Sequence, residues 1–389
     1  MNRMTHIDNH LRVLRQQAGL SQTELARTIG VTRQAIYAIE MNHYLPSTDM
    51  ALRLARVLGC QVEDLFHLDS AENVIYADFI GTVPEGSSAI RAQIARVGDR
   101  TIARPLADLG EILNYAVPAD GLILRAGLES PSQRGQVKVQ VQLLKSIQRI
   151  EETLIVGGCD PAIFLAGSHF SSTSKPPSVI GWSMGSVQAI DALKRGDVHI
   201  AGLHLVDPVT HDANISFLKK HLKPKAYTVV RFAAWEQGLM VRRGNPKAIR
   251  GLADSTRRNV RVVNREIGAA ARFLFDQQLT MVGIRPDQVR GYGDLELSHL
   301  HVGKAIVEGR ADMGIGVRSA ALFFNLDFLP LQEEKYDLVI PTAFLTSHPS
   351  VAGFLDTLVS RTFQTEIDAL GGYDIRDMGN VINWTKASS

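Results

Sequence analysis

Apolar positions in the first 66 residues recur with the period of short amphipathic helices. In the segment 21–40, Ser21 and Glu24 have the spacing of a capping box, Gly30 marks a helix end, and Thr32 is placed to cap a second helix. Because the connection is short, the two helices must meet at a steep angle. The pattern predicts a helix-turn-helix unit whose second helix enters the DNA major groove, with flanking helices at 11–15 and 51–58. Its apolar face consists of Leu25, Ala26, Ile29, Ile36 and Ile39.

The period changes to two between residues 74 and 146. Segments 90–94 and 137–143 alternate apolar and polar residues, and Gly98 with Asp99 has the composition of a tight turn into 100–103. The pattern predicts a small, mostly antiparallel β module, which follows a polar connection at 67–73. This module either bridges the DNA-binding unit to the rest of the chain or helps to form a dimer.

From about residue 150, short apolar strands alternate with helices, which indicates parallel sheets covered on both faces. Three of the strand-to-helix turns are small and polar. In an α/β sheet such turns gather at the carboxyl ends of the strands, where helix N-termini offer free N–H groups to an anion or a compact polar ligand. The alternative is that their Gly and Ser residues only make tight turns. We expect strands at 153–156, 179–182, 199–205, 238–241, 261–264 and 311–317, and helices at 187–195, 271–279 and 300–308.

Composition narrows the class of protein. A chain of 389 residues holds two or three domains, and its two cysteines, Cys60 and Cys159, are too few for a disulfide framework and fit a reducing cytoplasm. No apolar run reaches the roughly 20 residues of a membrane span, and no secretory signal opens the chain. Residues 1–60 hold seven Arg and four acidic residues, a formal net charge of +3. Because this charge is modest, we expect a homodimer or a higher even-numbered oligomer that binds two DNA half-sites.

The run LRQQAGLSQTELARTIGVTRQAIYAIEMNHYLPSTDMALRLARVLGCQVEDLF resembles the XRE-type (Cro/C1) helix-turn-helix domain over nearly its whole length. The resemblance implies an all-α, five-helix DNA-binding domain at 1–69, and a transcription regulator rather than an enzyme. On the second helix, Arg33 suits guanine and Gln34 suits adenine, while residues before and after it suit phosphates. The alternative is a merely solvated helix face. The expected DNA-binding residues are Gln22, Thr32, Arg33, Gln34, Tyr37, Asn42 and His43.

A second resemblance covers about 150–380. Segments such as GGCDPAIFLAGSH, GWSMGSVQAIDALKRGDVHIAGLHLVDP and VEGRADMGIGVRSAA are similar to the type II periplasmic-binding-protein-like fold, and more narrowly to molybdate- and tungstate-binding proteins. This implies a two-lobed α/β ligand-sensing domain at 150–389. Lobe one spans about 150–238 and 337–389, lobe two spans about 240–334, and crossing strands lie near 237–241 and 336–340. The fold class is then multi-domain α + β + α/β, with 70–149 as a β-rich linker module.

The second resemblance places a small anionic effector in the cleft between the lobes, either a molybdate- or tungstate-like oxyanion or an organic carboxylate. Arg265 is the main expected donor, since its guanidinium suits both ligands; the alternative is that it pairs with Glu266. Ala269 and Ala271 stand where the family pattern has hydroxyl residues, which favours an organic anion, with 167–170 as an aromatic wall. The expected ligand-binding residues are Gly158, Cys159, Asp160, Ser183, Met184, Gly185, Ser186, His204, Asn264, Arg265, Gly268, Ala269, Ala270 and Ala271.

The sequence gives weaker support to a metal site or to an enzyme. The histidine pairs His199/His204 and His299/His301 lack the spacing of a zinc site, so we expect no metal and no cofactor besides the effector. Cys159 at a helix start leaves open an enzyme-like cleft that uses its thiol. A further alternative is a constitutive repressor whose C-terminal domain serves only as a dimerisation body. We expect a cytoplasmic, ligand-responsive regulator in which cleft closure changes the spacing or affinity of paired DNA-binding units.

Overall fold

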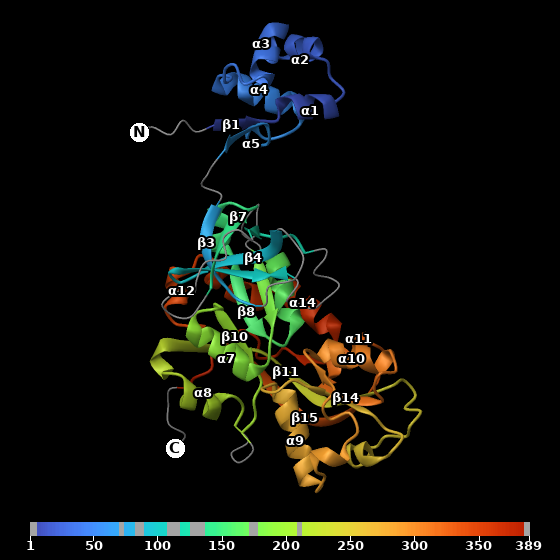
Figure 1. The fold of residues 1–389 in the computed structure, drawn as a ribbon. Helices are drawn as coiled ribbons and strands as arrows, with labels where there is room; N and C mark the ends of the chain where they lie inside the picture. Colours follow the sequence, from blue (N-terminus) through green and yellow to red (C-terminus); the bar gives the residue numbers. More distant parts are fainter. Residues whose placement is uncertain are drawn as a thin grey trace. The chain divides into compact units, whose positions relative to one another are not determined.

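The computed structural model describes residues 6–69, 74–81, 89–106, 117–124, 137–170, 178–207 and 212–384. The chain divides into two compact units, Met1–Val74 and Ile75–Ser389, and each is described by itself (Figure 1). Among the described residues, no helix is both long enough and apolar enough to cross a membrane.

Residues 6–69, the described stretch of the N-terminal unit, form five helices and a pair of strands. Leu25, Ile36 and Leu54 are fully buried in one core, so the predicted apolar faces meet. The side chains of Ser21 and Thr32 cap the second and third helices, as predicted. The elements are β1 (His6–Asn9), α1 (Leu11–Gln17), α2 (Gln22–Ile29), α3 (Arg33–Glu40), α4 (Thr48–Leu58), α5 (Val62–Leu65) and β2 (Phe66–Asp69).

Strands β1 and β2 form an antiparallel pair that the sequence did not predict. Their register runs from His6 opposite Asp69 to Asn9 opposite Phe66. The expectation of a purely helical unit followed by a polar connection was therefore wrong at 67–69. Both strands are short and largely polar, so they lack the alternating apolar pattern that identifies a half-buried strand. They are identified by their backbone pairing.

Five strands close into a small barrel in the order β3-β5-β4-β6-β7. The pairs are antiparallel except for β3 with β5, which is parallel. The predicted turn at Gly98 joins β4 to β5, with a φ of 61°. Ile94, Ile123 and Val141 are fully buried in the barrel interior. The strands are β3 (Val74–Phe79), β4 (Ala89–Val97), β5 (Arg100–Pro105), β6 (Gly121–Leu124) and β7 (Lys138–Leu143).

The barrel packs against the first lobe of the α/β domain. The Arg100 guanidinium pairs with Asp78 of β3 at 2.7 Å and with Asp197 of the lobe at 3.2 Å. The indole N–H of Trp182 in the lobe donates to Gln93 Oε1 of the barrel at 3.1 Å. Polar pairs that are largely shielded from water thus fix the barrel to the lobe.

The α/β domain is built on one large mixed sheet. Its strands are β8 (Leu154–Gly158), β9 (Val179–Ser183), β10 (Ile200–Leu203), β11 (Tyr227–Val241), β12 (Val262–Arg265), β13 (Leu295–Glu296), β14 (Met313–Val317), β15 (Asp327–Pro341) and β16 (Tyr373–Asp374). The order is β13-β12-β14-β11-β15-β10-β8-β9, and β16 pairs with β11. Strands β8, β9 and β10 are parallel, as are β12, β13 and β14. The predicted α/β pattern is confirmed.

Helices flank and connect these strands. They are α6 (Ile147–Glu152), η5 (Pro161–His169), α7 (Ser186–Arg195), α8 (Ile215–His221), η6 (Pro224–Ala226), η7 (Leu252–Thr256), α9 (Ala270–Met281), η8 (Pro286–Gln288), α10 (His299–Val307), α11 (Arg318–Phe323), α12 (Phe344–Ser347), α13 (Val351–Leu358) and α14 (Arg361–Leu370). Helices α7 and α8 belong to the first lobe and α9 and α10 to the second (Figure 1).

Strands β11 and β15 connect the two lobes. Each has 15 residues, and they pair with each other along most of their length. Residues 337–339 of β15 also pair with β10 in lobe one, whereas residues 237–241 of β11 pair with β14 in lobe two. The crossing therefore lies around 234–235 and 334–335, a few residues before the expected stretches. Both strands begin well before the apolar runs from which they were predicted.

Candidate functional site

Helix α3 is the candidate DNA-reading element of the N-terminal unit. Thr32 caps it, and the side chains of Arg33, Gln34 and Tyr37 are exposed, with 49% of Tyr37 accessible. The opposite, apolar face of the helix is buried in the core. The exposed face therefore offers the donors and acceptors that can read guanine and adenine edges.

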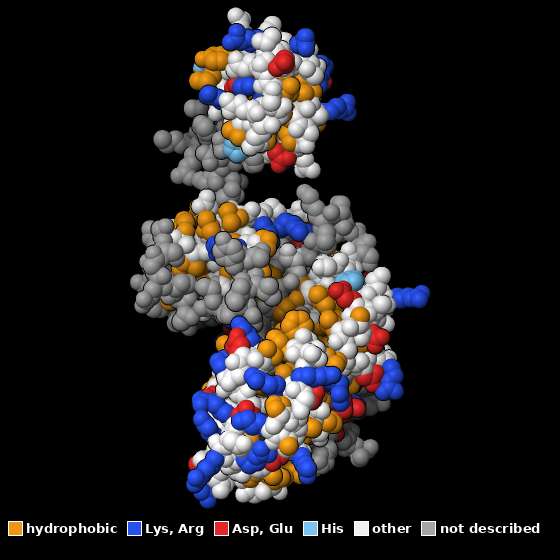
Figure 2. Space-filling view, turned by 90° about the vertical axis from the view of Figure 1, so that its right-hand side faces the viewer, with side chains coloured by type: hydrophobic (Ala, Val, Ile, Leu, Met, Phe, Trp, Pro, Cys, Tyr) orange, Lys and Arg blue, Asp and Glu red, His pale blue; other side chains and the backbone are white. Residues whose placement is uncertain are grey.

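The remaining predicted DNA contacts are partly used inside the unit. The amide of Gln22 donates to Glu40 Oε2 at 2.8 Å. Asn42 has a φ of 55° just after α3, and its side-chain oxygen accepts from Asn9 at 2.9 Å. His43 is exposed. On the face seen in Figure 2, basic side chains are spread over this unit rather than gathered into one patch, in keeping with its modest charge.

The two lobes touch where the starts of helices α7 and α9 face each other. A Cβ atom added to Gly185 would lie 2.9 Å from the carbonyl oxygen of Gly268 and 3.0 Å from the Cα of Ala269. Gly268 has a φ of 91°, a conformation that favours glycine. The cleft is closed at this point, and position 185 has room only for a residue without a side chain.

Several predicted cleft residues use their side chains within their own lobe. The sulfur of Met184 packs against β8, and Ser186 Oγ accepts from the backbone N–H of His204 at 3.2 Å. Asn264 Oδ1 accepts from the N–H of the following residue at 2.9 Å. Ser183 is exposed. These side chains therefore shape the loops of the cleft more than they offer groups to a ligand.

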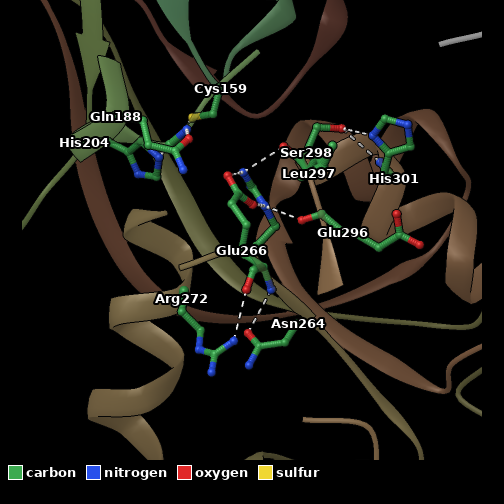
Figure 3. Close-up of polar contacts among 12 residues, drawn as sticks. Cys159, Gln188, His204, Asn264, Glu266, Arg272, Glu296, Leu297, Ser298 and His301 are labelled. Carbon is green, nitrogen blue, oxygen red and sulfur yellow. Dashed lines mark hydrogen bonds and ion pairs between the residues drawn. The ribbon is translucent and has the colours of Figure 1, made fainter. Parts of the chain in front are cut away.

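Arg265, the main expected donor, is fully buried and largely occupied. Its Nε and Nη2 form a bidentate ion pair with Glu266 at 2.8 and 3.0 Å. The same nitrogens donate to the carbonyl oxygens of Glu296 and Leu297, both at 3.2 Å (Figure 3). The pairing with Glu266, left open as the alternative, is thus formed. Only Nη1 has no hydrogen-bond partner among the described residues.

Two other segments that sequence analysis assigned to the cleft differ in what they contribute. Residues 269–271 start α9 and are buried at the lobe contact. By contrast, Phe170 belongs to the core of lobe one, where it meets Gly353, and His169 pairs with Glu366. The expected aromatic wall at 167–170 was therefore wrong, because this segment is tied into the core and to α14.

A chain of buried polar side chains crosses the cleft. Cys159 Sγ, after β8, lies 3.1 Å from Nε2 of His204, after β10 (Figure 3). His204 Nδ1 lies 2.5 Å from Oε2 of Glu334 on β15, and Gln237 Nε2 donates to the same oxygen at 2.8 Å. Burial lowers the pKa of His204, but Cys159 and Glu334 outweigh that effect and raise the pKa to about 10. Sequence analysis named Cys159 and His204 separately, and the structure joins them.

Aromatic residues that sequence analysis missed surround this chain. The ring of His204 lies 5.1 Å from Trp235 and 5.8 Å from His299, and Trp235 lies 4.7 Å from Tyr336, measured between centroids. His299 was weighed only as a partner of His301, but α10 buries His299 in the cleft. A sequence signal did exist in β11, where polar residues interrupt the apolar run YTVVRFAAWEQGLMV.

The Tyr336 hydroxyl fills the place where the first helix start of lobe one faces the cleft. A Cβ on Gly158 would lie 2.2 Å from this oxygen, and a Cβ on Gly202 would lie 2.0 Å from it. Burial raises the pKa of Tyr336 well above its usual range, with Cys159 and Asp160 adding to the effect. The Tyr336 hydroxyl thus occupies the space beside Gly158, where sequence analysis expected a small anion.

These residues carry buried polar atoms that have no hydrogen-bond partner among the described residues. Each such atom costs about 1–3 kcal/mol when left unsatisfied, so their concentration at one place points to a ligand. Burial also raises the pKa of Asp160 to about 6 and lowers that of His299 well below its ordinary value. The atoms are Asp160 Oδ2, Trp235 Nε1, Gln237 Oε1, Arg265 Nη1 and both ring nitrogens of His299.

Comparisons with known proteins match both parts of the chain. A helix-turn-helix model matches residues 11–65, and a PBP superfamily domain model matches residues 168–359. The YvgK protein of Bacillus subtilis (strain 168) is 30% identical over 242 residues, which are 61% of this chain and 77% of that protein. The chain belongs to the PBP superfamily, joined here to an N-terminal helix-turn-helix domain. The resemblances to a helix-turn-helix domain and to the periplasmic-binding-protein-like fold are thus confirmed, whereas the narrower likeness to molybdate- and tungstate-binding proteins stays a prediction.

Two further relatives cover one part each. An HTH-type transcriptional regulator of Methanothermobacter thermautotrophicus is 50% identical over 60 residues, 15% of this chain and 87% of that protein. Among solved structures, an ABC-type phosphate transport receptor from Vibrio cholerae is similar at 12% identity and a TM-score of 0.38, over 57% of this chain and 99% of that one. At these values the likeness carries no conclusion about the ligand.

The PBP-superfamily domain also has a pocket beside the buried cluster. Its volume is about 320 Å³, and it lies between α8 of lobe one and α9 of lobe two. Glu334 belongs to both the pocket and the cluster. The apolar lining of the pocket suits the body of a small organic molecule. That lining includes Leu205, Phe217, Phe273 and Leu274, and its polar members include Asn214, Lys220, Gln277 and Gln332.

Proposed function

We propose that this chain is a one-component transcription regulator. The helix-turn-helix domain binds an operator as a dimer, and the PBP-superfamily domain closes on a small ligand, which changes DNA binding. The exposed polar face of α3 and the family matches support the first part. The observation that carries the second part is the group of buried polar atoms at the lobe contact for which the described part of the chain offers no hydrogen-bond partner.

The mixture of donors and acceptors favours an organic acid among small anions. Arg265 Nη1 and Trp235 Nε1 are donors that suit a carboxylate. Asp160 Oδ2 and Gln237 Oε1 accept, so they need a donor on the ligand. A molybdate or tungstate ion carries no such donor, and alanines replace the hydroxyl groups that would bind it. We therefore favour a small carboxylate that also carries a hydroxyl, amino or amide group, with its apolar body in the neighbouring pocket.

A thermal-shift screen of the full chain tests this proposal. The panel contains molybdate, tungstate, sulfate, phosphate, and hydroxy- and amino-substituted carboxylic acids. A ligand at 100 times its dissociation constant adds about 2.7 kcal/mol of stability, so we expect a clear shift with at least one substituted acid. A panel in which no compound raises the melting temperature would contradict the proposal.

Two tryptophan variants locate the ligand. Trp235→Phe removes a buried N–H that has no partner among the described residues, so we expect weaker ligand binding with little loss of stability. Trp384→Phe is the matched control, because the Trp384 indole donates to Tyr227 O at 3.2 Å outside the cleft. This control lowers stability but leaves ligand affinity unchanged. Equal affinity in Trp235→Phe would place the ligand elsewhere.

A thiol-dependent enzyme is the second candidate, favoured by one observation. Cys159, His204 and Glu334 are arranged as a nucleophile, a base and an orienting carboxylate. Against it, Cys159 is only 4% exposed, so a substrate reaches its sulfur only if the cleft opens. A regulatory response that survives in Cys159→Ala, with no turnover by the unaltered chain, would eliminate the enzyme candidate.

A further inference from the structure

We propose that Cys159, His204 and His299 bind a transition-metal ion of the zinc class at the base of the cleft. Each residue offers one donor atom, and these atoms all lie within 4.8 Å of one another. All three residues are buried: Cys159 is 4% exposed, and His204 and His299 are each 2% exposed. One thiolate and two imidazoles form a donor set that zinc and related ions prefer.

The spacing of the donors is close to that of a tetrahedral site. Zinc–sulfur bonds of about 2.3 Å and zinc–nitrogen bonds of about 2.0 Å put the donor atoms of such a site about 3.3–3.5 Å apart. Cys159 Sγ and His204 Nε2 are already 3.1 Å apart. His299 therefore has to approach the other two by about 1 Å, a distance estimated from the same bond lengths. A rotation of one side chain at the start of α10 covers such a distance.

The surroundings of His299 favour a metal ion over further hydrogen bonds. Neither of its ring nitrogens has a partner among the described residues. A buried neutral imidazole has a lone pair available for a metal ion. His204, in turn, has its other nitrogen against Glu334, the carboxylate contact that orients metal-binding histidines. The bidentate pairing with Glu266 offsets the charge of the nearby Arg265.

The site joins the two lobes. Cys159 and His204 follow strands of lobe one, whereas His299 begins α10 of lobe two. An ion held by all three would stabilise the closed domain, which links metal binding to the conformational change. The protons that Cys159 and His204 lose on binding are released to solvent.

Three protein ligands leave a fourth coordination position. In zinc sites of this kind that position takes water or an exogenous ligand. The carboxylate of the organic acid proposed above would fit there, next to Arg265 Nη1, and only this last step rests on the proposed function. The metal site itself stands on the geometry of Cys159, His204 and His299.

Cobalt(II) titration of the reduced, metal-free full chain tests the site. We expect one ion per chain and a thiolate-to-cobalt charge-transfer band, which zinc then removes by displacement. In Cys159→Ser the band is lost, and in His299→Gln the affinity falls at least about 100-fold. Cys60→Ser and His301→Gln are matched controls, because Cys60 belongs to the N-terminal unit and His301 bonds Ser298 on the same helix as His299. We expect both controls to stay within about twofold of the unaltered chain.

The outcomes separate this site from the proposed function. Absence of the band, its survival in Cys159→Ser, or its loss in Cys60→Ser would overturn the metal site. Circular dichroism of each variant keeps the result interpretable, since a folded Cys159→Ser chain without the band supports the site. Stabilisation by an organic acid in the complete absence of metal, together with no band, would leave the regulator proposal standing and remove the metal. A cobalt band without stabilisation by any acid would support the metal site and contradict the proposed ligand-responsive regulator.

Discussion

Acid sensitivity of the contact between barrel and lobe one follows from a single buried histidine. His199 is fully buried, and its Nδ1 accepts from the N–H of Ile155 at 2.9 Å. Its Nε2 lies 2.9 Å from the carbonyl oxygen of Arg96 in the barrel and therefore carries the proton. Protonation of Nδ1 would break the first bond and bury a charge next to His348. Burial, with His348 adding to it, lowers the pKa of His199 to about 3.

The size of this stability loss follows from the difference between the pKa of His199 in the folded chain and its pKa in the unfolded chain. An unfolded histidine has a pKa of about 6.5, so the unfolded chain takes up this proton first as the pH falls. Because the folded pKa of His199 is the lower one, its contribution is fully present above pH 6.5 and is lost as the pH falls toward 3. Between pH 7 and pH 5 the loss is about 2 kcal/mol. His199→Gln keeps one acceptor and one donor but does not titrate, so this part of the loss disappears.

Urea unfolding at pH 7 and pH 5, followed by tryptophan fluorescence, measures the difference. All three tryptophans, Trp182, Trp235 and Trp384, lie in the second unit, so the signal reports that unit. The variant is expected to be less stable at pH 7, because glutamine fits the site less well. Only the change in the free energy of unfolding between the two pH values is compared between the variant and the unaltered chain. Parallel losses in the variant and the unaltered chain would refute a neutral, buried His199.

Three further predictions concern other parts of the molecule. Gly158→Ala should lower the free energy of unfolding by about 2 kcal/mol or more, because the new Cβ would clash with the Tyr336 hydroxyl. Tyr336→Phe in the same chain should restore most of this loss, because the ring Cζ lies 3.5 Å from the new Cβ. Additive losses in a double-mutant cycle would contradict the contact. Arg100→Met should cost about 3 kcal/mol in urea unfolding, because it removes the shielded ion pairs with Asp78 of the barrel and Asp197 of the lobe and leaves Asp197 only its contact with Arg195. A cost below about 0.5 kcal/mol, as for a surface pair, would argue against this interface. Arg33→Ala should weaken binding to selected DNA by about 1–3 kcal/mol and relax specificity at one base pair, whereas a uniform loss across sequences would make it a phosphate contact.

Local signals were enough to predict the helix-turn-helix domain. The caps at Ser21 and Thr32 and the apolar faces of α2 and α3 depend on residues three or four apart, so they can be read from the sequence. The alternation of strands and helices after residue 150 is equally local. Strands β1 and β2 were missed because they carry few apolar residues and are defined by pairing across the whole unit.

The cleft could be predicted only in part. Cys159 and His204 were found because they follow strands at the carboxyl edge of the sheet. Trp235 and Tyr336 were missed because their proximity depends on the pairing of β11 with β15, two strands far apart in the chain. His299 was judged by its sequence neighbour His301, whereas its contacts in the fold come from the other lobe. Spacing along the chain is a poor guide where a site forms between lobes.

In the proposed regulator, ligand binding in the cleft and DNA binding by the helix-turn-helix domain are coupled, and the DNA affinity with and without ligand measures this coupling. The full chain selects its preferred DNA from a random-sequence pool, and fluorescence anisotropy then gives the affinity for that DNA with and without the stabilising ligand from the thermal-shift screen. We predict a change of about 5- to 150-fold, corresponding to 1–3 kcal/mol of coupling, and an equal change in ligand affinity when DNA is bound. An identical DNA affinity at saturating ligand would contradict the account and favour a constitutive repressor.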